Sequence, residues 1–118
     1  IAEIGRLRDA VRAVEVNDRL REYVVRTVEA TREPARYSLP DLAPLIEYGV
    51  SPRAATFLAR GAQAYAFING RDYATPEDVK ALAPDVLRHR LVLTYEAEAR
   101  AVTADQVVTR ILEGVGLP

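Results

Sequence analysis

The chain has 118 residues, of which 49% are hydrophobic and 28% are charged, and its formal net charge is −1. This composition is typical of a globular domain with a modest core, and it excludes intrinsic disorder. The near-neutral charge argues against nonspecific attraction to nucleic acid or to an anionic membrane. No run approaches the roughly 20 apolar residues that cross a bilayer, and no signal peptide is evident, so we expect a cytoplasmic protein without membrane insertion.

Cysteine and methionine are absent from the sequence, and histidine occurs once. Disulfides are therefore impossible, and a zinc site is nearly excluded. Carboxylate-bound magnesium or calcium stays open, although no EF-hand loop is present, and we predict no metal site. A translated protein normally begins with methionine, whereas this chain begins with Ile1. We therefore expect residues 1–118 to form a single domain that is a fragment of a longer protein.

The first third of the chain predicts two amphipathic helices. Apolar residues recur at every third or fourth position from Ile4 to Val14, as on one face of a helix. Asn17 is a suitable N-cap for the second helix, because its side chain can accept a hydrogen bond from a free amide in the first turn. The apolar stripe of this second helix includes Leu20 and Val24.

A connection interrupted by prolines occupies residues 33–50. The sequence allows at most one short helical turn, near Pro40 to Leu42. The leucines of this segment and Ile46 are too apolar for a free linker, so we expect the segment to pack over the core. It also leaves room for a second functional surface.

A third helix is predicted over residues 52–68. The pair Asn69-Gly70 forms its C-terminal stop, because both residues tolerate the left-handed backbone conformation. Residues 71–74 then form a short, extended connector to the next helix.

A fourth helix is predicted to start at Pro76, and Pro84 predicts a kink or a restart because proline has no amide donor. Residues 91–95 alternate in polarity and predict a short extended segment, and the residues after them are ambiguous. The last helix begins near Thr103. The fold class is therefore all-α: a small bundle of about five helices with short extended segments near 71–74 and 91–95.

The third helix begins within an informative hexapeptide, Gly49-Val50-Ser51-Pro52-Arg53-Ala54. Ser51 is the predicted N-cap and Pro52 the first helical residue, so these two residues position Arg53 in the first turn. A cation there opposes the helix dipole at a cost of a few tenths to about 1 kcal/mol. An arginine beside free backbone amides can, however, bind a phosphate group.

The start of the fourth helix provides an internal control for this argument. It repeats the order of hydroxyl residue and proline, but its first turn is acidic, as the helix dipole prefers. Thr75 and Asp78 approximate a capping box there. Departures from a local rule occur preferentially at functional sites. A purely structural alternative stays open, in which Arg53 forms an ion pair with a surface carboxylate.

The sequence lacks the motifs of a self-contained catalyst, including GxxxxGK[ST], GxSxG and HExxH. The only histidine lies in the run Arg88-His89-Arg90 at a predicted helix end, where cations are favourable. We favour a charge cluster with a packed imidazole, and the alternative is an interface with a neighbouring domain or subunit. Glu96 and Glu98 fit a solvated surface better than an acid/base pair.

Three segments together resemble the C-terminal lid domain of MoxR-type AAA+ ATPases. They are residues 49–54, 70–79 and 86–91, and the order and spacing agree with that family. The trailing residues 95–99 and the last helix also agree, so the motif-rich part of the resemblance covers residues 49–113. Val50 departs from the small residue that is common at this position in the family.

The resemblance implies a helical lid that follows a nucleotide-binding core, which is missing from these residues. It implies that Arg53 is the sensor 2 residue, which contacts the γ-phosphate of ATP. ATP and Mg²⁺ would belong to the parent protein, with none expected on the fragment, which would not hydrolyse ATP by itself. The family further implies ring assembly, commonly as hexamers, and partners that carry a von Willebrand factor A domain.

The resulting hypothesis is a lid that couples ATP hydrolysis to chaperone-like remodelling in a bacterial cytoplasmic protein. Its partners would be the AAA+ core in cis and the neighbouring subunits of a ring. The alternative is a helical protein-interaction module without a nucleotide role. A helix-turn-helix DNA-binding domain is disfavoured, because a net charge of −1 without a basic stripe predicts no nucleic-acid partner.

Overall fold

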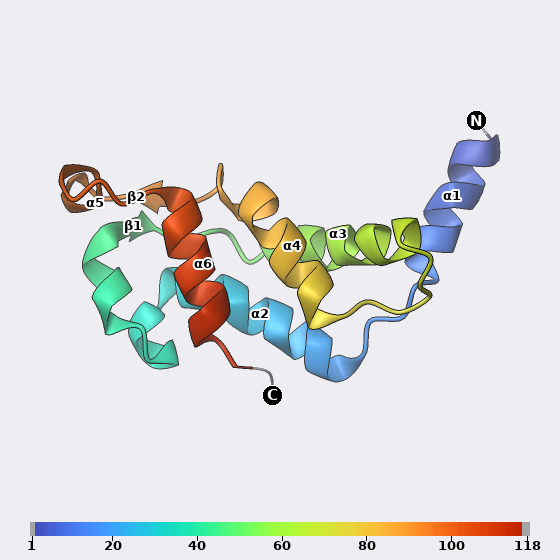
Figure 1. Ribbon diagram of the computed structural model, residues 1–118, viewed down its shortest axis with the longest axis horizontal. Coiled ribbons are helices and arrows are strands. Elements are labelled where there is room, and N and C mark those ends of the chain that lie inside the picture. Colours follow the sequence, from blue (N-terminus) through green and yellow to red (C-terminus); the bar gives the residue numbers. More distant parts are fainter. Residues whose placement is uncertain (1, 117–118) are drawn as a thin grey trace.

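Helices form most of this structure, a computed structural model that describes residues 2–116 (Figure 1). The described residues form an elongated body with extents of 49 × 30 × 21 Å. The elements in chain order are α1 (Ala2–Arg12), α2 (Asp18–Arg32), the 3₁₀ helices η1 (Pro34–Tyr37) and η2 (Pro40–Leu45), β1 (Ile46–Tyr48), α3 (Ala54–Ile68), α4 (Pro76–Leu87), β2 (Val92–Leu93), α5 (Tyr95–Ala99) and α6 (Ala104–Gly114). The predicted all-α class is therefore confirmed.

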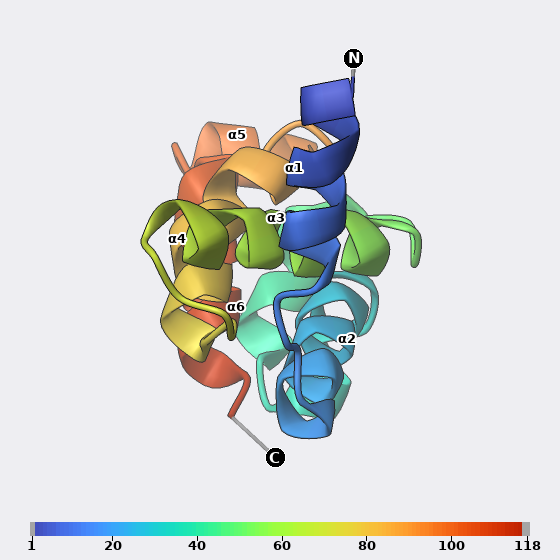
Figure 2. The same cartoon turned by 90° about the vertical axis from the view of Figure 1, so that its right-hand side faces the viewer.

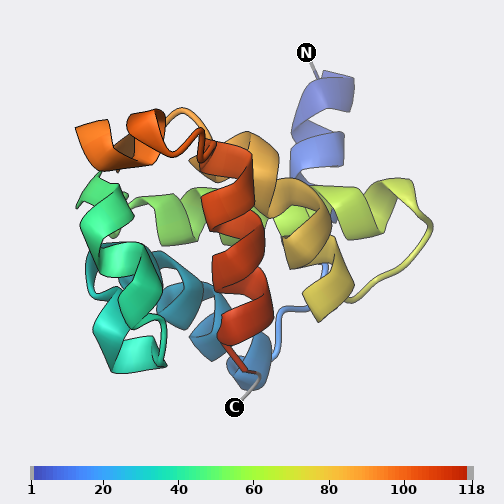
Figure 3. The same cartoon turned by 60° about the vertical axis from the view of Figure 1, so that its left-hand side comes forward.

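The core lies where α2, α3, α4 and α6 meet. Helix α3 packs against α4, and α6 lies beside α4 and in front of α2 (Figures 1 and 3). Fully buried side chains from all four helices meet here, among them Tyr23, Leu58, Leu87 and Ile111. The hydroxyl of Tyr23 donates a hydrogen bond of 3.2 Å to the carbonyl oxygen of Leu112, so this buried polar group is satisfied and ties α2 to α6.

The predicted helix boundaries at Asn17, Gly70 and Thr103 are confirmed. The Oδ1 atom of Asn17 accepts a 2.8 Å hydrogen bond from the amide of Leu20. Gly70 has a φ of 77°, which is the left-handed conformation that ends α3. Thr103 caps α6 through a capping box with Gln106. Such local hydrogen bonds within one turn are what a sequence pattern can predict.

Residues 33–50 contain more structure than the single turn that the sequence predicted. Two 3₁₀ helices begin at Pro34 and Pro40, because proline at the first position lacks only an amide that would be free there anyway. The predicted packing over the core is confirmed, since Leu39, Leu42 and Leu45 are buried.

Both predicted extended segments take part in small pairings. Strand β2 pairs antiparallel with β1, and Ile46 lies opposite Leu93. In the connector 71–74, Tyr73 forms an isolated parallel bridge with Glu15. The connector therefore links the segment after α1 to the start of α4.

Two predicted helix details are wrong. Helix α3 begins at Ala54 instead of Pro52. The turn before it has hydrogen bonds between residues three apart, as in a 3₁₀ helix, such as the 2.9 Å bond from the amide of Ala54 to the carbonyl of Ser51. The predicted restart of α4 is not found either, since the helix runs through Pro84 to Leu87, while the alternative of a kink at Pro84 stays a prediction. The missing amide of Pro84 deprives only the carbonyl of the exposed residue Lys80, which water can reach.

Helix α1 has the predicted helical form but stands apart from the core. It projects from one end of the body (Figures 1 and 2), and none of its residues is buried. No helix within residues 2–116 combines the length and the apolar character needed to cross a membrane.

Candidate functional site

The hexapeptide that starts at Gly49 is anchored by an unusually close contact with the end of α2. A Cβ atom at position 49 would lie 2.5 Å from the carbonyl oxygen of Thr31 and 2.6 Å from its carbonyl carbon. Real Cβ atoms do not approach backbone so closely, so only glycine lets the chain cross here. The backbone that leads to α3 therefore has a fixed position against α2.

Val50 continues this anchor into the core. Its side chain is fully buried, and its amide donates a 3.0 Å hydrogen bond to the Oγ1 atom of Thr31. The Thr31 hydroxyl in turn donates a 2.6 Å hydrogen bond to the carbonyl oxygen of Val28. Beyond Arg53, Ala54 is 1% exposed. Arg53 thus lies between two residues that are held in the interior.

Ser51, Pro52 and Arg53 are all exposed, in contrast to their neighbours. The Oγ atom of Ser51 accepts a 3.2 Å hydrogen bond from the amide of Arg53, and the ring of Pro52 restricts φ in the same turn. Ser51 therefore orders the turn before α3, but the prediction that it is the N-cap is wrong, because α3 begins at Ala54 and Arg53 takes the N-cap position. The backbone of Arg53 is ordered by these contacts while its side chain faces solvent.

The guanidinium group of Arg53 has no ion pair with any described residue between 2 and 116. The structural alternative, an ion pair between Arg53 and a surface carboxylate, is therefore not observed among residues 2–116. A fixed backbone with an unneutralised cation suits an anionic ligand from outside these residues.

A groove between α2 and α3 begins at Pro52, the residue before Arg53. Its first part has a volume of about 530 Å³ and includes Pro52, Val28 and Arg32. Its second part, of about 340 Å³, continues along α3 and shares Val25 and Ala55 with the first.

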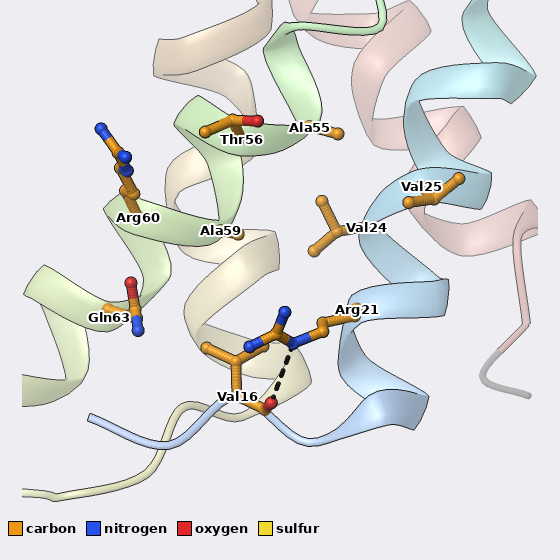
Figure 4. Close-up of a pocket in the computed structure, with 9 residues that line it drawn as sticks. All are labelled: Val16, Arg21, Val24, Val25, Ala55, Thr56, Ala59, Arg60 and Gln63. Atoms are coloured by element: carbon orange, nitrogen blue, oxygen red, sulfur yellow. Dashed lines mark hydrogen bonds between the residues drawn. The ribbon is translucent and has the colours of Figure 1, made fainter. Parts of the chain in front are cut away.

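Figure 4 shows this second part of the groove, with Val24 and Ala59 facing each other across it. Arg60 and Arg21 line the same part, and the Nε atom of Arg21 donates a 3.2 Å hydrogen bond to the carbonyl of Val16. This second part of the groove combines apolar and cationic side chains, which suits a ligand with apolar and anionic parts, whereas the first part is also lined by Glu29 and Glu33.

The second helix start, at Thr75, is neutralised within the chain. The capping box is present, since the amide of Thr75 donates a 2.7 Å hydrogen bond to Asp78 and the hydroxyl of Thr75 accepts one from the amide of Asp78. The two oxygens of Asp78 also accept hydrogen bonds of 2.7 and 2.5 Å from Arg71. These bonds from Arg71 are the main reason why the pKa of Asp78 lies below its ordinary value.

Sequence reasoning predicted the capping box but missed Arg71. The signal was available in the spacing, since an arginine stands in the extended connector just before an acidic first turn. The ion pair between Arg71 and Asp78 stabilises the connection between α3 and α4. Residues 70–79, the second of the three segments that resemble the family, therefore have a structural role.

The run Arg88-His89-Arg90 does not act as one cluster. Arg88 joins α4 to α6 through a 2.7 Å ion pair with Asp105 and a longer contact of 3.3 Å with Asp85. Its neighbour His89 is exposed, so the expectation of a packed imidazole is wrong. The cause is that α4 ends at Leu87 and the turn that follows directs this side chain outward.

Arg90 contacts α3 instead of an acidic partner. Its guanidinium carbon lies 4.9 Å from the centroid of the Phe57 ring, which is a cation–π distance. Phe57 is 51% exposed and lies one turn after Arg53 on α3. No described group of histidine, aspartate and glutamate residues is arranged to hold a metal ion, and Glu96 and Glu98 are exposed on α5.

Comparison with known proteins identifies this arrangement. Residues 41–111 match the family described as the AAA lid domain. Chaperone MoxR1 of Mycobacterium tuberculosis is 45% identical over 103 residues, which cover 87% of this chain and 27% of that protein. Protein MoxR of Methylorubrum extorquens is 34% identical over 122 residues, which cover 98% of this chain and 35% of that protein.

A solved structure agrees with these matches. The crystal structure of a candidate ATPase from Cytophaga hutchinsonii has a TM-score of 0.90 and 44% identity, over 93% of this chain and 33% of that chain. The chain therefore belongs to the AAA lid domain family and is the lid of a MoxR-type AAA+ ATPase. It spans between a quarter and about a third of the length of its curated relatives.

Proposed function

We propose that Arg53 is the sensor 2 residue of the parent ATPase and contacts the γ-phosphate of ATP. The observation that carries this proposal is the exposed and unneutralised guanidinium of Arg53 on a backbone fixed from both sides. Gly49 and Val50 set the position of that backbone against α2, and Ser51 and Pro52 order the turn itself.

The mechanism is electrostatic. Arg53 donates charge-assisted hydrogen bonds to a phosphoryl oxygen, so the lid is drawn toward the nucleotide while ATP is intact. Hydrolysis and phosphate release remove this contact, and the angle between lid and core changes. The adjoining groove beside Pro52 has an apolar wall of Val25, Val28 and Ala55 for the rest of the nucleotide, and its charged lining is mixed, because Glu29 and Glu33 lie there with Arg32 and Arg36. Mg²⁺ would be held by the core, because the described residues offer no ligand cluster for it.

The partners follow from the family. The lid would work with the AAA+ core in cis and with neighbouring subunits of a ring, commonly a hexamer, in the bacterial cytoplasm. The ring would perform chaperone-like remodelling with a partner that carries a von Willebrand factor A domain. Arg90 and His89 are exposed next to α3 and are candidate contacts to a neighbouring subunit.

The decisive experiment uses the full-length ATPase with Arg53→Ala. We expect a loss of ATP hydrolysis of about 100-fold, as is typical when one preorganised charge contact to a transition state is removed. Ring assembly and the thermal unfolding of the lid should stay as in wild type. The matched control is Arg100→Ala, since Arg100 is also exposed but pairs with Glu96 on α5, away from the site.

Unchanged hydrolysis in assembled Arg53→Ala protein would contradict the proposal and leave the interaction module as the better hypothesis. The 118-residue chain by itself should release no phosphate from ATP, because it contains no phosphate-binding loop of the GxxxxGK[ST] type.

A further inference from the structure

Helix α1 presents an apolar face that nothing in the described chain covers. The side chains of Ile4 and Leu7 are each 55% exposed, and Val11, at the next helical spacing, is only half-buried. An amphipathic helix gains most of its stability by burying such a face. Within residues 2–116 this face of α1 therefore lacks a partner.

The segment just after the C-terminal end of α1 is nevertheless anchored to the rest of the fold by hydrogen bonds. The Nε2 atom of Gln63 on α3 donates a 2.8 Å hydrogen bond to the carbonyl oxygen of Val14, which is itself buried. Glu15 is bonded to the α3–α4 connector through its backbone. Its amide donates a 2.9 Å hydrogen bond to the carbonyl oxygen of Asp72, and its carbonyl oxygen accepts a 2.8 Å hydrogen bond from the amide of Ala74. The structure thus fixes the C-terminal end of α1, while its N-terminal end projects from the body (Figure 2) and carries the exposed side chains of Ile4 and Leu7.

A groove of about 520 Å³ lies between this face and α3. Its apolar wall is the face of α1 just described, and three arginines also line it: Arg8, Arg12 and Arg60. Within residues 2–116 no carboxylate lines the groove, and none of the three guanidinium groups forms an ion pair with a residue of this range. The groove therefore fits a segment that carries both apolar and acidic side chains.

We infer that this groove, the α1–α3 groove, binds an acidic amphipathic segment of the nucleotide-binding core in the same polypeptide. The inference rests on the proposed function, because it takes the lid to be linked to such a core. The relatives have two to three times more chain than the part that this lid matches.

A second copy of the chain is a poorer occupant than a segment in cis. Helix α1 has 11 residues and is about 16 Å long at 1.5 Å per residue. Its apolar face is far smaller than the roughly 800 Å² per partner that stable protein complexes bury. A contact in cis needs much less area, because a short tether gives an effective concentration in the millimolar range.

This contact would complement that of Arg53. Arg53 lies just before the first residue of α3, whereas Gln63, which holds α1, lies in the later half of the same helix. The core would then touch the lid at two places along α3. The contact at Arg53 would depend on the nucleotide, whereas the α1–α3 groove does not include Arg53, so we expect α1 to stay docked when the lid turns.

The test is amide hydrogen exchange of α1 in the full-length ATPase. In wild type we expect the α1 amides to exchange at least tenfold more slowly than unprotected amides, and Leu7→Asp should remove this protection. Exchange in α3 should not change, which shows that the lid is still folded. The control is Ile68→Asp, since Ile68 is 80% exposed and does not line the groove.

A second pair of variants tests the charge of the occupant. Arg8 lines the groove and Arg6, on the same helix, does not. Arg8→Glu should speed exchange of the α1 amides severalfold, and Arg6→Glu should leave it unchanged. Equal effects of the two variants would overturn the acidic character of the occupant.

Rapid exchange of α1 in wild type, or protection that persists in Leu7→Asp, would overturn the inference. Protection that rises with protein concentration would assign the groove to a second copy and would also overturn it. These outcomes are separate from the proposed role of Arg53, because Arg53→Ala should reduce hydrolysis without changing the exchange of α1.

Discussion

Helices α3 and α4 both begin after a hydroxyl residue and a proline, yet their first turns carry opposite charges. At α4 the capping acid, Asp78, is 1% exposed and is neutralised by Arg71 from the preceding connector. At α3 the hydroxyl of Ser51 accepts a hydrogen bond from the amide of Arg53, and the side chain of Arg53 extends into solvent without an ion pair among the described residues.

At the start of α4 both the backbone and the charged side chain have partners within the chain. At the start of α3 only the backbone has them. The charge at α4 satisfies amides of its own helix, so it serves stability. The charge at α3 opposes its own helix and is held in place by glycine and valine contacts that do not involve its side chain. This arrangement supports the proposal that Arg53 contacts an anionic group outside the chain.

The largest expected effect on stability is at Asp78. Asp78→Ala removes a buried carboxylate that accepts two hydrogen bonds from Arg71 and one from the amide of Thr75. We expect the free energy of unfolding to fall by about 3 kcal/mol in urea denaturation of the 118-residue chain. Glu77→Ala, in the same turn but exposed, should change it by less than about 0.5 kcal/mol. Similar values for the two variants would mean that the α4 start is no more complete than the α3 start.

The next largest effect is expected at Gly49. Gly49→Ala places a Cβ atom 2.5 Å from the carbonyl oxygen of Thr31, so α2 or the hexapeptide must move. We expect a loss of about 2 kcal/mol in thermal or chemical unfolding. Gly5→Ala is the matched control, because nothing lies within 4 Å of a Cβ there and alanine stabilises a helix interior by up to about 1 kcal/mol. A neutral Gly49→Ala would show that the backbone of Arg53 is not anchored at this contact.

Acid should weaken the α4 start selectively. The pKa of Asp78 is lowered in the folded chain, chiefly by the hydrogen bonds from Arg71. Its contribution to stability is therefore complete above the unfolded-state pKa of about 3.9 and is lost as the pH falls through the lower folded-state value. Between about pH 5 and pH 2, wild type should lose more unfolding free energy than Asp78→Asn. Parallel pH curves for the two proteins would contradict this assignment.

The smallest effect on stability is expected at Arg53 itself. Arg53→Glu replaces a cation by an anion beside the positive end of α3, so the chain should gain a few tenths of a kcal/mol at low salt. The gain should shrink as salt is added, because the site is exposed. Differential scanning calorimetry at two salt concentrations would measure it. A loss of more than about 1 kcal/mol would reveal a structural partner of Arg53 and remove the contrast with α4.

Several features of the fold and the site followed from the sequence because they depend on contacts within one turn. The caps at Asn17 and Thr103, the stop at Gly70 and the capping box at Thr75 are of this kind. The spacing of apolar residues placed the main helices, and the unusual charge of Arg53 is evident from the hexapeptide alone.

Local sequence patterns do not predict contacts between residues that are far apart in the sequence. The bond from the amide of Val50 to Thr31 joins residues 19 positions apart, and nothing in the hexapeptide shows why position 49 must be glycine. The exposure of His89 depends on where α4 ends.

The main helices, the caps at Asn17, Thr75 and Thr103 and the cation at position 53 can all be found in the sequence alone. Three features emerge only once the helices are packed: Arg53 lacks an ion pair among residues 2–116, Asp78 pairs with Arg71, and the apolar face of α1 is uncovered among the described residues. The two groups of features differ in the sequence separation of the contacts that produce them. Caps and periodicity arise from hydrogen bonds and side-chain spacing within a few residues, whereas burial and ion pairing depend on which distant segments the packed helices bring together.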